Sequence, residues 1–272
     1  MNIFNFLHAY TPNPVALSLG SVTIYWYGVI MAISIIVGIL MAIQVGRRRG
    51  IAIEEILDVA TAAIIGGLIG ARLYEIGLEW SYYSTHLSEI IKVWNGGLAI
   101  HGALIGGAIA VFIVIRNKTY NIWNILAVLL PGVALAQAIG RIGNWFNQEL
   151  FGLPTNLPWG IIIDQAHRPL QYMNNLYFHP TFLYEAKLLG LLAIILYYFA
   201  RKKQFPCSYI VAIYLIGQGL IRFSLEFIKI DSTPIVAGLR WPQVVSLVFI
   251  FLGIYIARQT FLRIKKSERS PL

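Results

Sequence analysis

The first long apolar run of the chain indicates its class: residues 22–45 read VTIYWYGVIMAISIIVGILMAIQV without a charged side chain, and Arg47, Arg48 and Arg49 follow. A helix crosses a bilayer with roughly 20 apolar residues, so this run predicts a membrane-spanning helix. In the whole chain 58% of the residues are hydrophobic and only 12% are charged. Such a composition has too few charges to surround a soluble core. We therefore expect an integral membrane protein.

Six further runs with few charges follow the first one, and together they predict seven spans. Spans one, three and four are nearly free of charge, whereas spans two, five and six have ionisable residues towards one end. We expect an all-α integral membrane protein in which residues 1–272 form a single polytopic membrane domain. The expected spans are 22–45, 56–77, 97–115, 120–140, 181–200, 205–227 and 241–258.

The basic residues predict the direction of the spans, because short cytoplasmic loops hold an excess of Lys and Arg. Thirteen of the 21 Lys and Arg residues cluster after spans one, three, five and seven, and the other eight lie singly towards the opposite side. This pattern predicts an N-terminus outside and a C-terminus in the cytoplasm. The clusters also account for the formal net charge of +9, so no nucleic-acid partner is expected.

The longest connection, residues 141–180, lies between spans four and five and is external on this topology. Several prolines interrupt any continuous helix across it. Its aromatic residues predict that it lies along the membrane interface instead of extending into water. These residues are Trp145, Phe146, Phe151, Trp159, Tyr172 and Tyr177.

One stretch at the outer end of span four combines small and polar residues: residues 140–152 read GRIGNWFNQELFG. Arg141 and Asn144 are three residues apart and share a helix face. Glu149, beyond the expected helix end, can fold back towards them. Glycines such as Gly152 permit a close approach of a ligand or of another backbone segment. The alternative is a polar helix end that satisfies its own carbonyl groups.

Span six contains a second charged group, in which Arg222 and Glu226 stand four residues apart on one helix face. A guanidinium has more donors than one carboxylate can accept, which leaves some of them to hold a phosphate. The alternative is an ion pair that only neutralises itself.

Two further candidates lie at the outer ends of other spans. His101 is followed by Gly102 and Gly106, which have the spacing of close helix packing. His101 is therefore either a packed histidine or a catalytic or ligand-binding one. Tyr27 either contacts a ligand or belongs to the aromatic belt. The residues alone leave both alternatives open.

Arg72, near the outer end of span two, completes a set of three arginines with Arg141 and Arg222. On the predicted topology these arginines share a membrane depth with Asn144 and His101. Fixed guanidinium groups at that depth suit an anionic headgroup whose acyl chains stay in the bilayer. A phospholipid is the expected ligand.

The stretch from Arg141 to Gly152 resembles the corresponding stretch of the prolipoprotein diacylglyceryl transferase family, and the resemblance extends over nearly the whole chain. This long stretch is highly specific, and shorter ones agree in order and spacing. The shorter matches are Trp26-Tyr27-Gly28, Gly70-Ala71-Arg72, His101-Gly102, His179-Pro180-Thr181-Phe182-Leu183-Tyr184-Glu185 and Arg222-Phe223-Ser224-Leu225-Glu226.

The resemblance implies an enzyme of the bacterial cytoplasmic (inner) membrane that takes part in lipoprotein biosynthesis. Its implied partners are phosphatidylglycerol, prolipoproteins with a lipobox, and the lipid bilayer. The implied reaction transfers the diacylglyceryl group of phosphatidylglycerol to the lipobox cysteine thiol, which forms a thioether and releases glycerol phosphate.

The resemblance also implies roles for individual residues. His101 would be the general base, and Tyr27 and Arg72 would contact substrate. Gln218 stands where many members have a tyrosine, and Ala127 where they have an aspartate, so the detailed roles of neighbouring polar groups differ here. The implied essential set is Arg141, Asn144, Glu149, Gly152, Arg222 and Glu226.

A lipid transporter or flippase is the alternative from another class, because buried charges also mark substrate pathways. Such a protein should show internal repeats and polar residues near the middle of the membrane, and neither is evident in the sequence. Cys207 is the only cysteine, and no metal-ligand spacing is present, so neither a metal nor another cofactor is expected.

Overall fold

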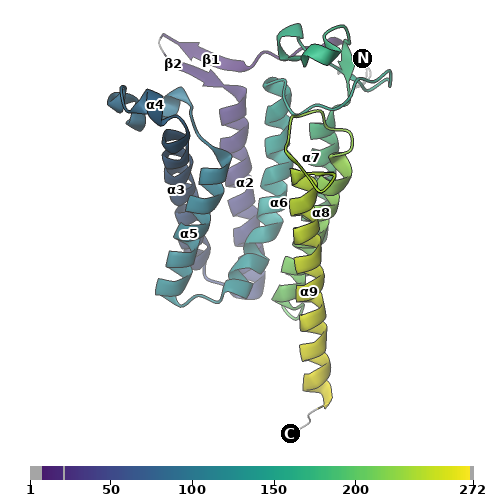
Figure 1. The fold of residues 1–272 in the computed structure, drawn as a ribbon. Coiled ribbons are helices and arrows are strands. Elements are labelled where there is room, and N and C mark those ends of the chain that lie inside the picture. The colour runs from purple at the N-terminus through teal and green to yellow at the C-terminus, as the bar shows by residue number, and fades with distance from the viewer. Residues whose placement is uncertain (1–7, 21, 270–272) are drawn as a thin grey trace. The chain divides into compact units, whose positions relative to one another are not determined.

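The computed structural model describes residues 8–20 and 22–269 of the chain (Figure 1). Seven helices in these residues are long and apolar enough to cross a membrane, which confirms the predicted number of spans. The protein is therefore a mostly helical, multi-pass membrane protein. The seven helices are α2 (Trp26–Arg49), α3 (Ile53–Leu78), α5 (Ile100–Lys118), α6 (Ile122–Phe146), α7 (Thr181–Ala200), α8 (Cys207–Leu225) and α9 (Trp241–Arg269).

Three span boundaries differ clearly from the predicted ones. The last span was predicted to end at residue 258, but α9 continues to Arg269. Residues 22–25, predicted as helix, form strand β2 (Val22–Tyr25), which pairs antiparallel with β1 (Val15–Leu19). β-branched and aromatic residues such as these favour strands. Near the start of α2, α6 continues beyond residue 140 to Phe146, so the polar stretch that begins at Arg141 starts inside the helix.

The connections between the spans contain only short elements. Four of these elements are strands, which form two antiparallel pairs. The other five are short helical segments. These elements are α4 (Trp80–Tyr83), η1 (Leu87–Ile91), η2 (Val93–Asn95), β3 (Ile161–Ile162), η3 (Gln165–His167), η4 (Leu170–Tyr172), β4 (Tyr177–Phe178), β5 (Ile235–Val236) and β6 (Leu239–Arg240).

The chain forms two compact units, one of residues 1–45 and 126–272 and the other of residues 46–125. The single membrane domain stays a prediction. In the smaller unit, α3 and α5 pack through glycines. A Cβ atom added to Gly70 would lie 2.3 Å from the carbonyl oxygen of Gly102, and one added to Gly106 would lie 2.3 Å from that of Gly66. The predicted close-packing role of Gly102 and Gly106 is confirmed.

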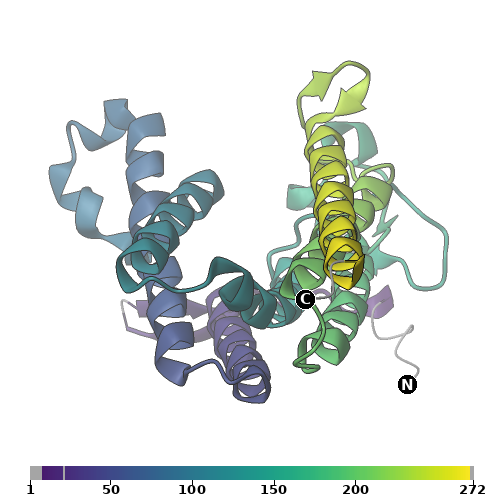
Figure 2. The ribbon, with the colours of Figure 1, turned by 90° about the horizontal axis from the view of Figure 1, so that it is seen from below.

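In the larger unit, α9 runs alongside α8, and α8 in turn contacts α7 (Figures 1 and 2). Gly219 of α8 lies against α9, because a Cβ atom added there would come within 2.7 Å of the carbonyl oxygen of Ser246. The helices α2 and α6 meet in the same way at Gly38 and Gly132. Small residues thus set the helix contacts in both units, as is usual in membrane proteins.

The connection between α6 and α7 folds around an apolar core of its own. Phe151, Ile161 and Phe178 are buried there, and Trp145 and Tyr172 pack against them. Part of its aromatic content is therefore explained by packing, while its position along the membrane interface stays a prediction. The guanidinium of Arg168 donates hydrogen bonds to the carbonyl oxygens of Ile163 at 2.8 Å and Met173 at 3.0 Å, which fixes the course of the loop.

Candidate functional site

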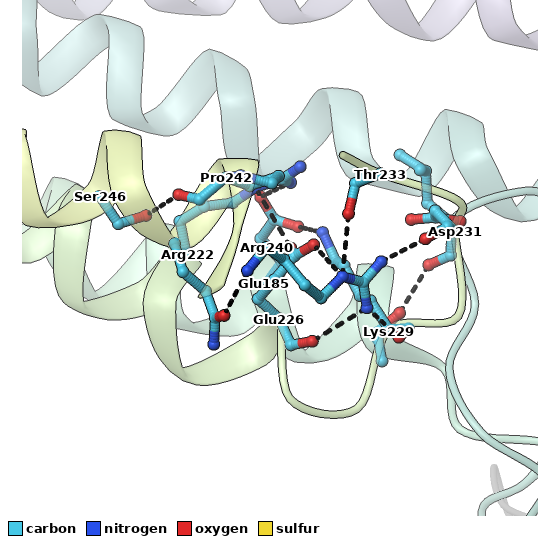
Figure 3. A network of polar contacts seen from close by, with 12 residues as sticks. Glu185, Arg222, Glu226, Lys229, Asp231, Thr233, Arg240, Pro242 and Ser246 are labelled. Carbon is cyan, nitrogen blue, oxygen red and sulfur yellow. Dashed lines mark hydrogen bonds and ion pairs between the residues drawn. The ribbon is translucent and has the colours of Figure 1, made fainter. Parts of the chain in front are cut away.

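Glu185 is the centre of a buried cluster of charges in the first turns of α7, with a side chain that is 1% exposed. Its Oε1 lies 2.7 Å from Nη2 of Arg141 on α6 and 3.6 Å from Nη1 of Arg222 on α8. Its Oε2 accepts a hydrogen bond of 2.9 Å from Nζ of Lys229, which follows α8 (Figure 3). One carboxylate therefore joins cations from three parts of the chain.

Glu226, at the end of α8, is the second buried carboxylate of the cluster. Its Oε1 lies 3.1 Å from Nε of Arg240, and its Oε2 lies 3.9 Å from Nε of Arg222 (Figure 3). The predicted approach of Arg222 and Glu226 is confirmed, but as a long contact. Arg240, which is distant in sequence from the predicted motif, is the closer partner of Glu226.

The cluster has a surplus of positive charge. Its ion pairs join four cationic side chains, Arg141, Arg222, Lys229 and Arg240, to two carboxylates, so the cations outnumber the carboxylates that they contact. The side chain of Lys229 is 0% exposed, whereas those of Arg141 and Arg222 are 25% and 31% exposed. A ligand can therefore reach the two arginines on the spans, while Lys229 is inaccessible.

Arg240 holds the loop between α8 and α9 in place. Its guanidinium donates hydrogen bonds to the carbonyl oxygens of Glu226, Lys229 and Asp231, and to Oγ1 of Thr233 at 3.0 Å (Figure 3). Arg222 differs from it, because within the described residues its guanidinium has only the two long ion-pair contacts. The donors of Arg222 are thus the ones left for a ligand.

Burial affects the two ionisable residues of this loop in opposite directions. It lowers the pKa of Lys229, an effect only partly opposed by the carboxylate of Glu185. It raises the pKa of Asp231 against the attraction of Lys229, Arg222 and Arg240. In both cases the shift favours the neutral form, as expected where water is largely excluded.

The end of α6 folds as the sequence predicts. Glu149 turns back, and its Oε1 accepts hydrogen bonds from Nδ2 of Asn144 at 2.8 Å and Nδ2 of Asn147 at 3.1 Å. The Oδ1 of Asn144 in turn lies 3.5 Å from Nη1 of Arg141. The predicted fold-back of Glu149 is confirmed, and it connects this carboxylate to Arg141 through one amide.

Gly152 lies between two segments of the chain that are too close together to admit a side chain at this position. A Cβ atom added there would lie 2.6 Å from the carbonyl oxygen of Ile228 and 2.7 Å from Cγ2 of Thr181. Gly152 also forms a β-bridge with Lys229 and donates its N–H to the carbonyl oxygen of His179. Its role in the structure is to bring the loop of Lys229 against the start of α7.

Tyr27, at the start of α2, lies beside the same stretch of α6. A Cβ atom added to Gly143 would come within 2.8 Å of Cδ2 of Tyr27. The absence of a side chain at Gly143 therefore lets the tyrosine ring pack directly on α6, two residues after Arg141.

Arg72 and His101 belong to the other compact unit, so the predicted common depth of the three arginines stays a prediction. Arg72 is buried, and its guanidinium donates to the carbonyl oxygens of Ile90 at 2.9 Å, Gly96 at 2.7 Å and Gly97 at 2.8 Å, and also to that of Glu89. These bonds fix the connection between α3 and α5. Its donors are therefore engaged by its own loop.

His101, in the first turn of α5, is exposed, and its ring centroid lies 6.0 Å from that of Tyr74 on α3. It is therefore not a packed core histidine in this unit, and its imidazole is accessible. Its predicted role as a base is not tested by these contacts.

Sequence reasoning missed Lys229 and Arg240, and it noted Glu185 only as part of a stretch that matches the family. The available signal was the isolated position of both cations on the poorly charged outer side of the predicted topology. Within the described residues, no group of three or more His, Cys, Asp or Glu side chains is placed to hold a metal ion.

Comparison with known proteins gives a consistent result. A family model described as prolipoprotein diacylglyceryl transferase matches residues 14–258. A phosphatidylglycerol–prolipoprotein diacylglyceryl transferase of Synechococcus elongatus is 41% identical over 249 residues, which cover 90% of this chain and 86% of the relative. The protein of the same name from Synechocystis is 41% identical over 248 residues, which cover 89% of this chain and 87% of the relative. The one from Acaryochloris marina is 41% identical over 247 residues, which cover 89% of this chain and 89% of the relative.

Proposed function

The chain belongs to the prolipoprotein diacylglyceryl transferase family, and from this premise we propose that it transfers the diacylglyceryl group of phosphatidylglycerol to a prolipoprotein. The acceptor is the thiol of the lipobox cysteine, and the products are a thioether-linked lipoprotein precursor and glycerol phosphate. The observation that supports this most directly is the positively charged cluster around Glu185, which matches an anionic lipid headgroup.

In this proposal Arg141 and Arg222 bind the phosphate. Glu185 pairs with both guanidinium groups, and it leaves donors on each, above all on Arg222. A guanidinium can offer a phosphate two parallel N–H groups. The buried Lys229 does not touch the lipid and instead holds Glu185 between the two arginines.

The reaction follows from this arrangement. The substrate thiolate attacks the glyceryl carbon bonded to the phosphate, the S–C bond forms as the C–O bond breaks, and the electron pair leaves with glycerol phosphate. The two arginines stabilise the charge that develops on the phosphate. A cysteine thiol has a pKa of about 8.5, so it must lose its proton near neutral pH, and His101 is the proposed base.

The other predicted residues have supporting roles in the proposal. Glu149 fixes the amide of Asn144 beside Arg141. Gly152 maintains the position of the Lys229 loop. Tyr27 and Arg72 are assigned to substrate contacts, and for Arg72 this requires that one of its carbonyl partners be exchanged for the ligand.

Transfer to the substrate thiol is direct. Cys207, the only cysteine of the chain, is the first residue of α8, whereas Arg222 lies near the end of that helix. At 1.5 Å per residue the two are roughly 22 Å apart along the axis. An enzyme-linked thioether at Cys207 therefore has no place in the proposed reaction.

The proposed location is the cytoplasmic (inner) membrane of a bacterium, with the N-terminus outside and the C-terminus in the cytoplasm. Support comes from the basic clusters at one end of the spans, such as Arg47, Arg48 and Arg49 in the last turn of α2. The site residues Arg141 and Arg222 lie near the last turns of α6 and α8, which on the proposed topology supports a reaction at the outer side.

A single experiment tests the proposed function. Purified protein is incubated with phosphatidylglycerol and a lipobox peptide, and mass spectrometry follows the peptide. The expected result is a gain equal to one diacylglyceryl group, together with released glycerol phosphate. Movement of labelled phosphatidylglycerol between leaflets without any change in the peptide would instead support a lipid transporter or flippase.

A further inference from the structure

Each of the two accessible arginines has a glutamine four residues before it on the same helix. Gln137 precedes Arg141 on α6, and Gln218 precedes Arg222 on α8. Residues four apart share a helix face, and the step between them is about 6 Å along the axis. Both amides therefore lie one turn nearer the middle of the span than the arginines.

The two amides differ in their contacts. Oε1 of Gln137 accepts a hydrogen bond of 3.4 Å from the hydroxyl of Tyr214. Oε1 of Gln218 is buried and has no hydrogen-bond partner among the residues that the structure describes. Inside a bilayer, water and lipid tails do not supply the missing donor. A ligand that brings a donor to this position would satisfy the amide.

The need for a donor separates the two proposed substrates. At and below its phosphate, a phospholipid presents phosphate oxygens and ester carbonyls, which only accept hydrogen bonds. A polypeptide backbone presents an N–H next to a C=O, which is the same donor and acceptor pair that a primary amide presents in reverse. The acceptor cysteine must also reach the carbon next to the phosphate held by Arg222, one turn from Gln218.

We propose that the side-chain amide of Gln218 pairs with a backbone peptide group of the acceptor polypeptide beside its reactive cysteine. Oε1 accepts the N–H, and Nε2 donates to a C=O. This inference rests on the proposed function. Gln218 is then a positioning residue, which aligns the thiol with the glyceryl carbon. Recognition through the backbone suits an enzyme whose acceptors differ in side chains.

The test uses the purified full chain, phosphatidylglycerol and a series of lipobox peptides. In each peptide one backbone amide next to the cysteine is replaced by an ester, which removes one N–H donor. In the wild type, one such replacement should lower kcat/KM by roughly fivefold to tenfold, the effect of one lost hydrogen bond. The Gln218→Met variant should show a similar loss with the unmodified peptide and no further loss with that ester peptide.

Gln137→Met is the matched control, because it removes the same side chain at the same step before an arginine, and its amide oxygen has a partner in Tyr214. This variant should keep the sensitivity of the wild type to the ester replacement. Thermal unfolding verifies that both variants are folded. If Gln218→Met does not fold, the ester series on the wild type decides alone. In that case the proposal is overturned if none of the ester replacements lowers the kcat/KM of the wild type.

Two other results also overturn the inference. One is equal sensitivity of the wild type and Gln218→Met to every ester peptide. The other concerns phosphatidylglycerol with ester-linked or ether-linked chains. If the only effect of Gln218→Met is that the enzyme no longer distinguishes these two lipids, the amide contacts the lipid and not the peptide. A wild type that transfers no diacylglyceryl group to any peptide overturns the proposed function itself.

Discussion

Lys229 and Glu185 form a buried ion pair in which Nζ lies 2.9 Å from Oε2, with side chains that are 0% and 1% exposed. The two residues are 44 positions apart in sequence, and their contact joins the loop after α8 to the first turns of α7. Removing two charges from water is costly, and their attraction offsets that cost only while both are present. The pair therefore constrains position more than it adds stability.

Replacing Glu185 by leucine should lower the free energy of unfolding by about 3–5 kcal/mol, because Lys229 is then buried without a counter-charge. Changing Lys229 to leucine as well should restore part of the loss. Denaturant unfolding in detergent measures both. The control is Glu89→Gln, which breaks the partly exposed Lys92–Glu89 pair and should cost about 0–1 kcal/mol. Equal effects of Glu185→Leu and the control would contradict the buried pair.

Lys229 should also make stability depend on alkaline pH. Burial lowers its pKa in the folded protein, whereas the unfolded value is about 10.4. Between these values the folded state binds fewer protons than the unfolded state, so the free energy of unfolding rises with pH. The gain is complete above the unfolded value and is lost as pH falls through the folded one.

In Lys229→Met this rise should be absent, while Lys92→Met should retain it. Unfolding midpoints measured from neutral pH to about pH 10 compare the variants. Parallel curves for the wild type and Lys229→Met would show that this lysine does not titrate differently on folding.

Arg141→Lys and Arg222→Lys should each lower turnover of phosphatidylglycerol by about 10²–10³-fold, the usual effect of removing a donor from a developing anion. Lysine keeps the charge, but it cannot hold a carboxylate and a phosphate with one planar fork. The exposed Arg116, in the last turn of α5, provides the control, and Arg116→Lys should be fully active. Near wild-type turnover in both site variants would defeat the proposed geometry.

If His101 is the base, His101→Gln should lower turnover strongly and affect lipid binding little. Raising the pH towards the thiol pKa of about 8.5 should then restore part of the rate, because more of the substrate is already thiolate. Turnover is measured against pH with one lipobox peptide. Ordinary turnover at neutral pH would exclude His101 as the base.

Gly152→Ala should reduce both stability and activity. The new Cβ atom would meet Ile228 and Thr181 at distances that require the loop to move, and such overpacking costs about 1–3 kcal/mol. Gly190 in α7 is the matched control, because an added Cβ atom there meets nothing within 4 Å. Gly190→Ala should be neutral or slightly stabilising. A Gly152→Ala variant with the stability of Gly190→Ala would exclude the tight contact.

The parts of the fold that follow from local patterns could be predicted from the sequence. Apolar runs with few charges identified all seven spans, and helical spacing identified the approach of Arg222 and Glu226. The fold-back of Glu149 was also accessible, because it needs only a helix end between Asn144 and Glu149, which are five residues apart.

The centre of the site could not be predicted in the same way. Glu185 meets Lys229 and Arg141 only because α7 packs with α6 and with the segment that follows α8, and no local pattern encodes which residues then face one another. The carbonyl partners of Arg72 and Arg240 have no sequence signal at all, since every residue has a backbone carbonyl. The short strand β2 was assigned to a helix because a uniformly apolar run does not distinguish the two.

Three connections between spans follow the same construction, in which Arg72, Arg168 or Arg240 binds backbone carbonyl oxygens of its own loop. Exchanging the side chains of such a loop leaves the acceptors in place, whereas inserting or deleting a residue moves them away from the guanidinium. These loops are therefore open to substitution during evolution but restricted in length. Variants of this chain can therefore differ widely in the side chains that these loops expose while the path of the chain around each arginine stays the same.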